Sequence, residues 1–158
     1  MATKYDLHSS PGPLIRRSHQ IGLAIFSEAF KDLDMTTLQF SIMFTLRHEP
    51  GIDQITLANL VALDRATCSN IVTRLDKKGY IKRKVNPKNQ RAKLVYLTAK
   101  GDKLLADSEA PMMEVQKKLI APLNKEEKKM FLHCLQKLVD SNNELSRAPM
   151  RYLEIKRS

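Results

Sequence analysis

Residues 64–100 read DRATCSNIVTRLDKKGYIKRKVNPKNQRAKLVYLTAK, and this stretch decides the fold. Its first part has helical spacing, because four apolar side chains recur at i, i+3, i+4 and i+7. They are Cys68, Ile71, Val72 and Leu75. Asp64 is a suitable N-cap and Gly79 a suitable terminator. The pattern predicts an amphipathic helix with one buried and one polar face.

Two short runs, 81–85 and 93–97, follow this helix with hydrophobic residues in near alternation. Between them lies the polar segment 86–91, NPKNQR, which contains turn-forming residues and the basic side chains Lys88 and Arg91. The pattern predicts a β-hairpin with a basic tip.

The positive charge of the chain is concentrated in this stretch. Eleven Lys and Arg against two Asp give residues 64–100 a net charge of +9, while the whole chain carries +10. A basic hairpin beside a polar helix face suits a DNA groove and its flanking phosphates. The expected DNA-reading side chains of the helix are Arg65, Thr67, Ser69, Asn70, Thr73 and Arg74.

Two other interpretations of these charges exist. The polar face can simply be solvated, and an anionic membrane surface also attracts basic residues, although it favours a single amphipathic helix. The remaining basic side chains of the stretch are expected to contact phosphates or solvent rather than bases. They are Lys77, Lys78, Lys82, Arg83 and Lys84.

The segments before residue 64 complete a helix-turn-helix. Thr36 and Gln39 have the spacing of a capping box, which predicts a helix over 37–48. A short helix over 56–63 then leads by a tight link into the polar-faced helix, an order typical of helix-turn-helix proteins. The hairpin is the wing, so we expect a mainly α fold with a small β wing.

Apolar seams also occur at both ends of the chain. A helix over 14–30 and two helices after residue 98 have wide apolar faces, and Cys134 lies in the last seam as an expected core residue. One alternative is that these helices pack on each other and on no partner chain. A homodimer built from both termini is the simpler solution. We expect an N-terminal arm and dimerisation helix at 1–35, a winged helix-turn-helix lobe at 36–100, and C-terminal dimerisation helices at 101–158, all within one integrated domain.

Composition excludes several classes of protein. No apolar run is long enough for a bilayer and the N-terminus lacks a signal-peptide core, so we expect a cytoplasmic protein. The chain lacks GxSxG, HExxH, P-loop and dinucleotide-binding motifs, so we expect neither an enzyme nor a cofactor. Its two cysteines and four histidines have no metal-ligand spacing, so no metal site is expected.

The chain resembles the multiple-antibiotic-resistance regulator (MarR) family of bacterial transcription factors over about residues 11–147. The strongest matches are LDKKGYI at 75–81 and RAKLVYLTAKG at 91–101. The family's acidic wing-turn residues are replaced here by Asn86, Asn89 and Gln90, while Arg91 is kept. The resemblance implies a dimeric repressor that binds a pseudo-palindromic operator, with Arg91 contacting the minor groove or a phosphate.

The segment LIRRSHQ at 14–20 is similar to a subgroup that controls the catabolism of aromatic acids, such as hydroxycinnamates, benzoates or nicotinates. This likeness implies release from DNA by a small aromatic carboxylate. Arg16 and His19 are neighbours on a helix and can clamp a carboxylate, with Phe40 and Phe44 as an apolar wall. The alternative is that His19 is a core histidine and Arg16 pairs with an acid across the dimer.

Two rival functions remain at this point. Cys68 can be a redox switch if it is exposed in an electropositive setting, although its spacing predicts a buried, structural cysteine. A non-specific architectural DNA-binding protein would also carry this charge. Peroxide-driven release and the ratio of specific to non-specific affinity distinguish these rivals from a ligand-responsive repressor.

Overall fold

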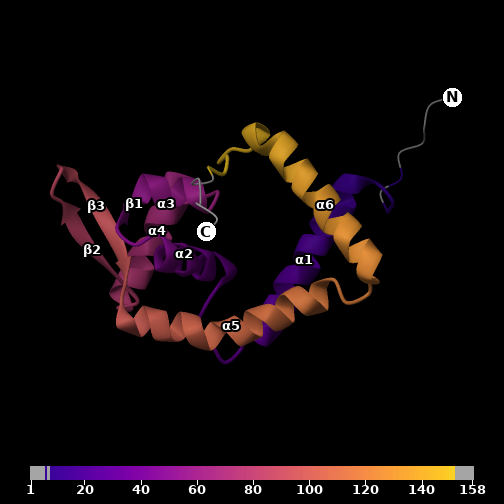
Figure 1. Ribbon diagram of the computed structural model, residues 1–158, viewed down its shortest axis with the longest axis horizontal. Helices are drawn as coiled ribbons and strands as arrows, with labels where there is room; N and C mark the ends of the chain where they lie inside the picture. Colours follow the sequence, from indigo (N-terminus) through magenta and orange to yellow (C-terminus); the bar gives the residue numbers. More distant parts are fainter. Residues whose placement is uncertain (1–5, 7, 152–158) are drawn as a thin grey trace.

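A computed structural model describes residue 6 and residues 8–151 of the chain, apart from the Arg91 side chain. The helices are α1 (Pro11–Ala29), α2 (Thr37–His48), α3 (Gln54–Leu60), α4 (Arg65–Lys77), α5 (Ala99–Leu119) and α6 (Lys125–Asn142). The strands are β1 (Ile52–Asp53), β2 (Ile81–Asn86) and β3 (Asn89–Leu97), and a 3₁₀ turn, η1 (Asn143–Leu145), follows α6. Figure 1 shows one compact group from α2 to β3, here called the winged lobe, with α5 leading away from it.

The sheet is antiparallel with the order β1-β3-β2. Ile52 pairs with Val95, and Ile81 pairs with Leu97. The hairpin ends on the Asn86–Asn89 pair, after a register shift between Val85 and Asn86, so the strands extend into the segment expected to be a turn. Only Pro87 and Lys88 remain between the strands, because backbone hydrogen bonds extend a ladder regardless of side-chain polarity. The wing is therefore longer and its turn tighter than the sequence predicted.

Helix boundaries in the winged lobe follow capping chemistry. The Thr36 hydroxyl accepts a hydrogen bond from the Gln39 backbone N–H at 3.2 Å, and the Gln39 side chain accepts one from the Thr36 N–H at 2.9 Å. Asp64 caps α4 and Thr98 caps α5 in a similar way. The helix starts predicted at Thr36 and Asp64 are confirmed, and the first helix after residue 98 begins at Ala99. The first helix begins at Pro11, earlier than expected, because a proline is compatible with the first turn of a helix.

The core of the winged lobe lies where α2, α3, α4 and the sheet meet. From α4 it takes Cys68, Val72 and Leu75, all essentially inaccessible to solvent, so the predicted buried face is confirmed. Buried side chains from the other elements complete it: Ile42, Met43, Leu46, Leu57, Ile81, Val95 and Leu105. Packing this face inward leaves the polar face of α4 on the surface.

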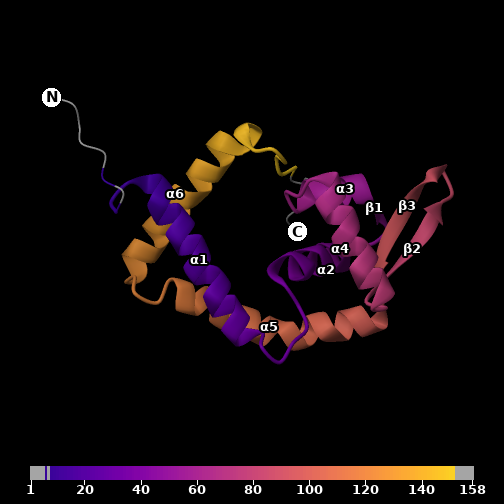
Figure 2. The same ribbon diagram turned by 180° about the vertical axis from the view of Figure 1, so that it is seen from behind.

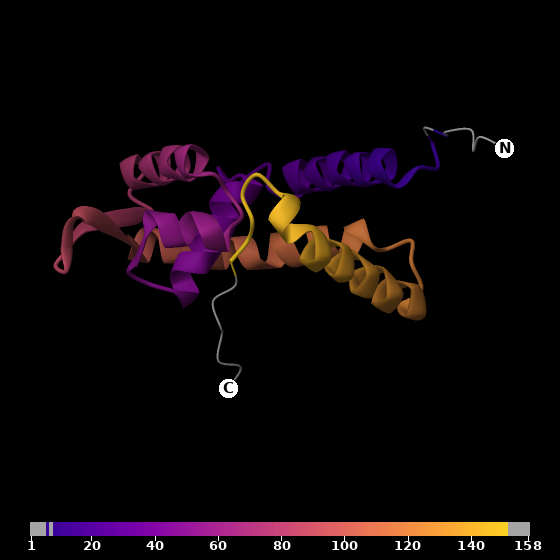
Figure 3. The same cartoon turned by 90° about the horizontal axis from the view of Figure 1, so that it is seen from above.

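The long helices outside the lobe are only partly covered. Helix α1 packs on α5, and Figure 3 separates α1 from α6, which overlap in Figure 1. Figure 2 shows the same arrangement from behind. No residue of α6 is buried. The expectation that Cys134 lies in the core is therefore wrong for this chain, because Cys134 is exposed and the seam of α6 is not buried among the described residues.

This architecture is a winged helix-turn-helix, as the sequence predicted. The expected mainly α fold with a small β wing is confirmed. Among the described residues, no helix has the length and apolar character needed to cross a membrane.

Candidate nucleic-acid interface

Helix α4 presents the predicted polar side chains on one surface. Arg65, Asn70 and Arg74 are exposed, while Ser69 and Thr73 are half-buried beside them. The same helix buries its opposite face, so its orientation is fixed by the core. These five side chains are therefore held on a rigid element, as base or phosphate contacts require.

Thr67, the sixth predicted DNA-reading residue, is engaged within the protein. Its hydroxyl donates to Asp64 Oδ2 at 2.7 Å, and its backbone N–H donates to Asp64 Oδ1 at 3.0 Å. These hydrogen bonds lower the pKa of the Asp64 carboxyl group. Thr67 thus holds the start of α4 in place, and its hydroxyl proton is already used within the protein.

The wing carries further basic groups around a tight turn. Asn86 Oδ1 accepts the Lys88 backbone N–H at 2.9 Å, which closes the turn and leaves the Lys88 side chain exposed. A hydrogen bond to the backbone two residues later is typical of an asparagine that stabilises its own turn. The backbone of Arg91 lies in β3, but its side chain falls outside the described residues.

Two basic residues expected to meet phosphate or solvent form ion pairs instead. Arg83 Nη2 of the wing lies 2.7 Å from Asp76 Oδ2 of α4, and Lys78 pairs with Asp34 of the α1–α2 loop. The expectation for these two side chains is therefore corrected. Lys78 and Asp34 are distant in sequence, and Asp76 and Arg83 lie on opposite sides of a turn. Helical spacing alone therefore does not reveal either pair.

Four other lysines of the stretch remain at the surface. Lys77, Lys82, Lys84 and Lys93 are exposed. The Lys84 ammonium group lies 5.4 Å from the centre of the Tyr96 ring, close enough for a cation–π contact. The positive surface therefore extends from α4 across the wing, even after Arg83 and Lys78 are paired.

Arg47 forms a link between two elements that the sequence did not single out. Its Nε donates to Asp102 Oδ1 at 2.8 Å and its Nη2 to the Asp102 backbone oxygen at 2.9 Å, while Nη1 pairs with Glu109. One side chain of α2 thus binds two acids of α5 and joins the winged lobe to the long helix. The two acids are seven residues apart, which places them on one face of a helix, but nothing local indicates Arg47 as their partner.

The four residues expected to bind a ligand lie on two helices. Phe40 is half-buried and Phe44 exposed on α2, with ring centres 5.8 Å apart. Arg16 and His19 are exposed on the N-terminal half of α1. Within the described residues, neither Arg16 nor His19 has a hydrogen-bond or ion-pair partner. A single chain therefore brings the two aromatic rings together but leaves the two basic groups open.

A cavity of about 310 Å³ lies where the end of α1 meets the start of α2. It is lined by Leu23, Phe26, Ser27, Phe30, Lys31, Met35, Thr36 and Thr37. Phe30 also contacts Phe40 edge to face, with ring centres 6.3 Å apart. The aromatic rings of α2 thus continue into the wall of this cavity.

Cys68 occupies a buried position on α4. Its side chain is fully inaccessible, and its Sγ lies 3.9 Å from the backbone oxygen of Gln54. Burial, aided by the nearby negative charge of Asp64, raises the pKa of the Cys68 thiol to about 11. The thiolate that reacts with oxidants is therefore scarce at neutral pH.

Comparison with known proteins agrees with this geometry. The sequence pattern of the MarR family matches residues 35–93. The transcriptional repressor NicR of Pseudomonas putida is 30% identical over 140 residues, which cover 89% of this chain and 89% of NicR. This chain belongs to the MarR family. Transcriptional regulator HosA of Escherichia coli O111:H- is 28% identical over 68% of this chain and 80% of HosA.

Solved structures with the same fold align with this chain over nearly the whole of their own length. Bordetella bronchiseptica BpsR, whose DNA binding is regulated by 6-hydroxynicotinic acid, has a TM-score of 0.84 at 25% identity, covering 87% of this chain and 99% of BpsR. Streptomyces coelicolor PcaV, in complex with its natural ligand, has a TM-score of 0.79 at 27% identity, covering 88% of this chain and 98% of PcaV. This chain is thus a MarR-family transcriptional regulator.

Proposed function

We propose that this protein is a homodimeric, sequence-specific repressor that a small aromatic carboxylate releases from its operator. The observation that carries the proposal is the exposed polar face of α4 beside a basic wing. Residues 64–100 hold a net charge of +9, and most of these basic side chains are exposed. Such a surface suits the major groove and its flanking phosphates.

The dimer follows from apolar surface that the chain leaves open. Ile15 of α1 is 55% exposed, and Leu132 and Leu138 of α6 are 54% and 53% exposed. Apolar surface of this kind favours association, and a two-fold dimer is the commonest way to cover it. Two copies related by such an axis present two α4 helices to a pseudo-palindromic operator, about 34 Å apart.

Light scattering and DNA binding test this part of the proposal together. We expect a dimer at micromolar concentration, and an affinity for a selected operator about 10³-fold or more above that for random DNA. A monomer that binds one half-site at full affinity would overturn the dimer. A specific-to-random ratio near one would instead indicate an architectural DNA-binding protein.

Likeness to one repressor and two ligand-linked proteins supports an aromatic effector. NicR is a repressor, the DNA binding of BpsR is regulated by 6-hydroxynicotinic acid, and PcaV binds a natural ligand. In this chain, the unpaired Arg16 and His19 can bind a carboxylate by charge-assisted hydrogen bonds. Phe40 and Phe44 supply an apolar wall for the aromatic ring.

The proposed switch has a simple thermodynamic requirement. Because α1 belongs to the dimer contact, a ligand that prefers one spacing of the lobes changes the distance between the two α4 helices. Its effect is limited by its differential affinity for the two spacings, typically about 1–3 kcal/mol. By reciprocity, operator DNA must weaken ligand binding by the same factor.

Calorimetry with aromatic acids tests the ligand site. After a thermal-shift screen has found a ligand, we expect Arg16→Ala and His19→Ala to weaken it, while Arg17→Ala, a neighbour on the same helix, leaves it unchanged. Equal affinity in all four proteins would refute the placement of the site. Ligand affinity that is insensitive to operator DNA would refute the switch.

A further inference from the structure

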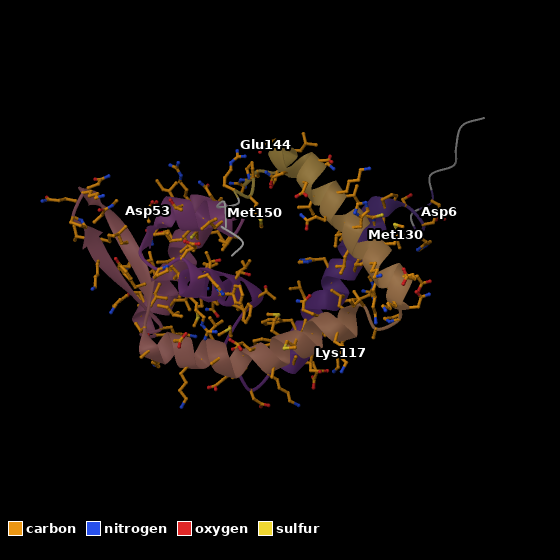
Figure 4. The ribbon with its side chains drawn as sticks, in the orientation of Figure 1. Asp6, Asp53, Lys117, Met130, Glu144 and Met150 are labelled. Atoms are coloured by element: carbon orange, nitrogen blue, oxygen red, sulfur yellow. The ribbon has the colours of Figure 1, made fainter. Side chains whose placement is uncertain are left out.

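The chain does not end at the last long helix. After α6 it turns through η1 and runs back to the winged lobe over residues 146–151, here called the C-terminal strap. Figure 4 shows this return, with Glu144 at the far end of α6 and Met150 beside the winged lobe. The strap thus joins two parts of the fold that are otherwise connected through α5.

The strap ends on the first helix of the helix-turn-helix. The backbone N–H of Arg151 donates to the backbone oxygen of Asn59 at 2.9 Å. Asn59 lies in the last turn of α3, and its backbone oxygen also accepts the Ala62 N–H at 3.4 Å. The strap therefore adds a second, shorter hydrogen bond to a carbonyl group at the helix end, immediately before the turn that leads into α4.

Asn143 holds the strap in this path. Its Nδ2 donates to the backbone oxygen of Met150 at 3.0 Å, and its Oδ1 accepts the Met150 N–H at 2.8 Å. The Arg151 guanidinium group also pairs with Glu144, with Nη2 3.0 Å from Oε2. One side chain at the end of α6 thus binds both polar groups of a residue seven positions later, and Met150 is half-buried there.

We propose that the C-terminal strap fixes the position of the winged lobe relative to α6, and that Asn143 is a positioning residue for the binding of α4 to DNA. The inference rests on the proposed function, since it concerns how two α4 helices match an operator. The lobe is linked to the other long helices by α5 and the α1–α2 loop on one side, and the strap closes the opposite side (Figure 1). A lobe held on both sides has less freedom to swing about α5.

The strap also reaches the helix that reads DNA. Hydrogen bonds from Thr67 lower the pKa of Asp64, the N-cap of α4, and the positive charge of Arg147 in the strap adds a smaller effect in the same direction. Arg147 is therefore close enough to the start of α4 to act on it electrostatically. Movement of the strap would change both the support under α3 and the charge beside α4.

Two variants remove the strap contacts, and each has a matched control. Asn143→Ala removes both hydrogen bonds to Met150, whereas Asn142→Ala removes only a bond to the Leu138 oxygen within α6. Arg151→Pro removes the N–H that binds Asn59, whereas Arg151→Ala keeps this N–H and loses only the pair with Glu144. Circular dichroism and light scattering on all four exclude general unfolding.

The first measurement is amide hydrogen exchange of residues 59–63 in the protein without DNA. We expect Asn143→Ala and Arg151→Pro to accelerate exchange by about tenfold, because losing a docking hydrogen bond favours local opening. The two controls should match the unaltered protein. Unchanged exchange in both strap variants would overturn the proposal, whether or not the chain binds an operator.

The second measurement compares operators whose half-sites are moved by one base pair. The unaltered protein should prefer one spacing, and the strap variants should lose most of this preference while their salt dependence stays the same. A uniform loss of affinity with a smaller salt slope would mean that the strap contacts phosphate, and would also overturn the proposal. If no variant binds any operator specifically, the proposed function fails, and the exchange measurement alone decides the strap.

Discussion

Arg83 of the wing and Asp76 of α4 form an ion pair across the joint between the two elements proposed to face DNA. Arg83 Nη2 lies 2.7 Å and Nε 2.9 Å from Asp76 Oδ2. The two side chains are only 26% and 29% exposed, so water screens the pair less than an open surface pair. The base of the wing is therefore held in a defined position relative to the helix that it flanks.

We expect Asp76→Asn to destabilise the protein by about 1–2 kcal/mol, between the values for exposed and buried pairs. Urea unfolding measures this change. Glu28→Gln is the control, since Glu28 pairs with Lys31 on an open helix surface at 3.4 Å and with both side chains more than 60% exposed. Equal destabilisation by the two substitutions would contradict a special role for the joint.

The helix and the wing are expected to divide the work of DNA binding. Asn70→Ala and Arg74→Ala should cost about 1–3 kcal/mol on the correct operator and little on random DNA, because base contacts carry the discrimination. Binding titrations against both DNAs measure the difference. A uniform loss on the two DNAs would assign these side chains to phosphates instead.

Lys88→Ala and Arg91→Ala should weaken binding to all sequences and lower the salt slope by about one contact each. Titration at several salt concentrations measures the slope. Lys117→Ala is the control, because Figure 4 shows Lys117 near the far end of α5, away from the wing. Equal slopes for the wing variants and the unaltered protein would count against a wing contact.

Two helical glycines are expected to respond in opposite ways to alanine. A Cβ atom on the buried Gly101 would overlap the backbone oxygen of Tyr80. Gly101→Ala should therefore destabilise the fold by about 3 kcal/mol. A Cβ atom on Gly22 would lie 3.8 Å from Leu119 Cδ1, an ordinary contact. Gly22→Ala should be neutral or stabilise the protein by up to about 1 kcal/mol. Thermal unfolding compares the two.

Cys68 is not expected to react with oxidants in the folded protein. Its pKa of about 11 and its burial predict that a thiol reagent at pH 8 labels it only after unfolding in urea. Mass spectrometry of peptides identifies the labelled cysteine. Peroxide should leave operator binding unchanged, and Cys68→Ser should behave in the same way. Release of DNA by peroxide that Cys68→Ser abolishes would restore the redox interpretation.

The local features of this chain were predictable from the sequence because their causes are local. Caps at Thr36, Asp64 and Thr98 act on backbone groups three residues away. The buried face of α4 follows from the spacing of Cys68 and its neighbours, and its polar face follows from the same spacing. The net charge of residues 64–100 needs no structure at all, so the expected winged helix-turn-helix rested on short-range information.

Tertiary structure alone decided which of these charged and apolar groups are free. Arg83 and Lys78 meet Asp76 and Asp34 only because the chain path brings them together, so a charge count could not separate them from exposed lysines. Cys134 has the spacing of a core residue but is exposed, since periodicity shows that a face is apolar and not what covers it. The bond from Arg151 to Asn59 spans more than ninety residues, and such contacts arise only when the whole chain has folded.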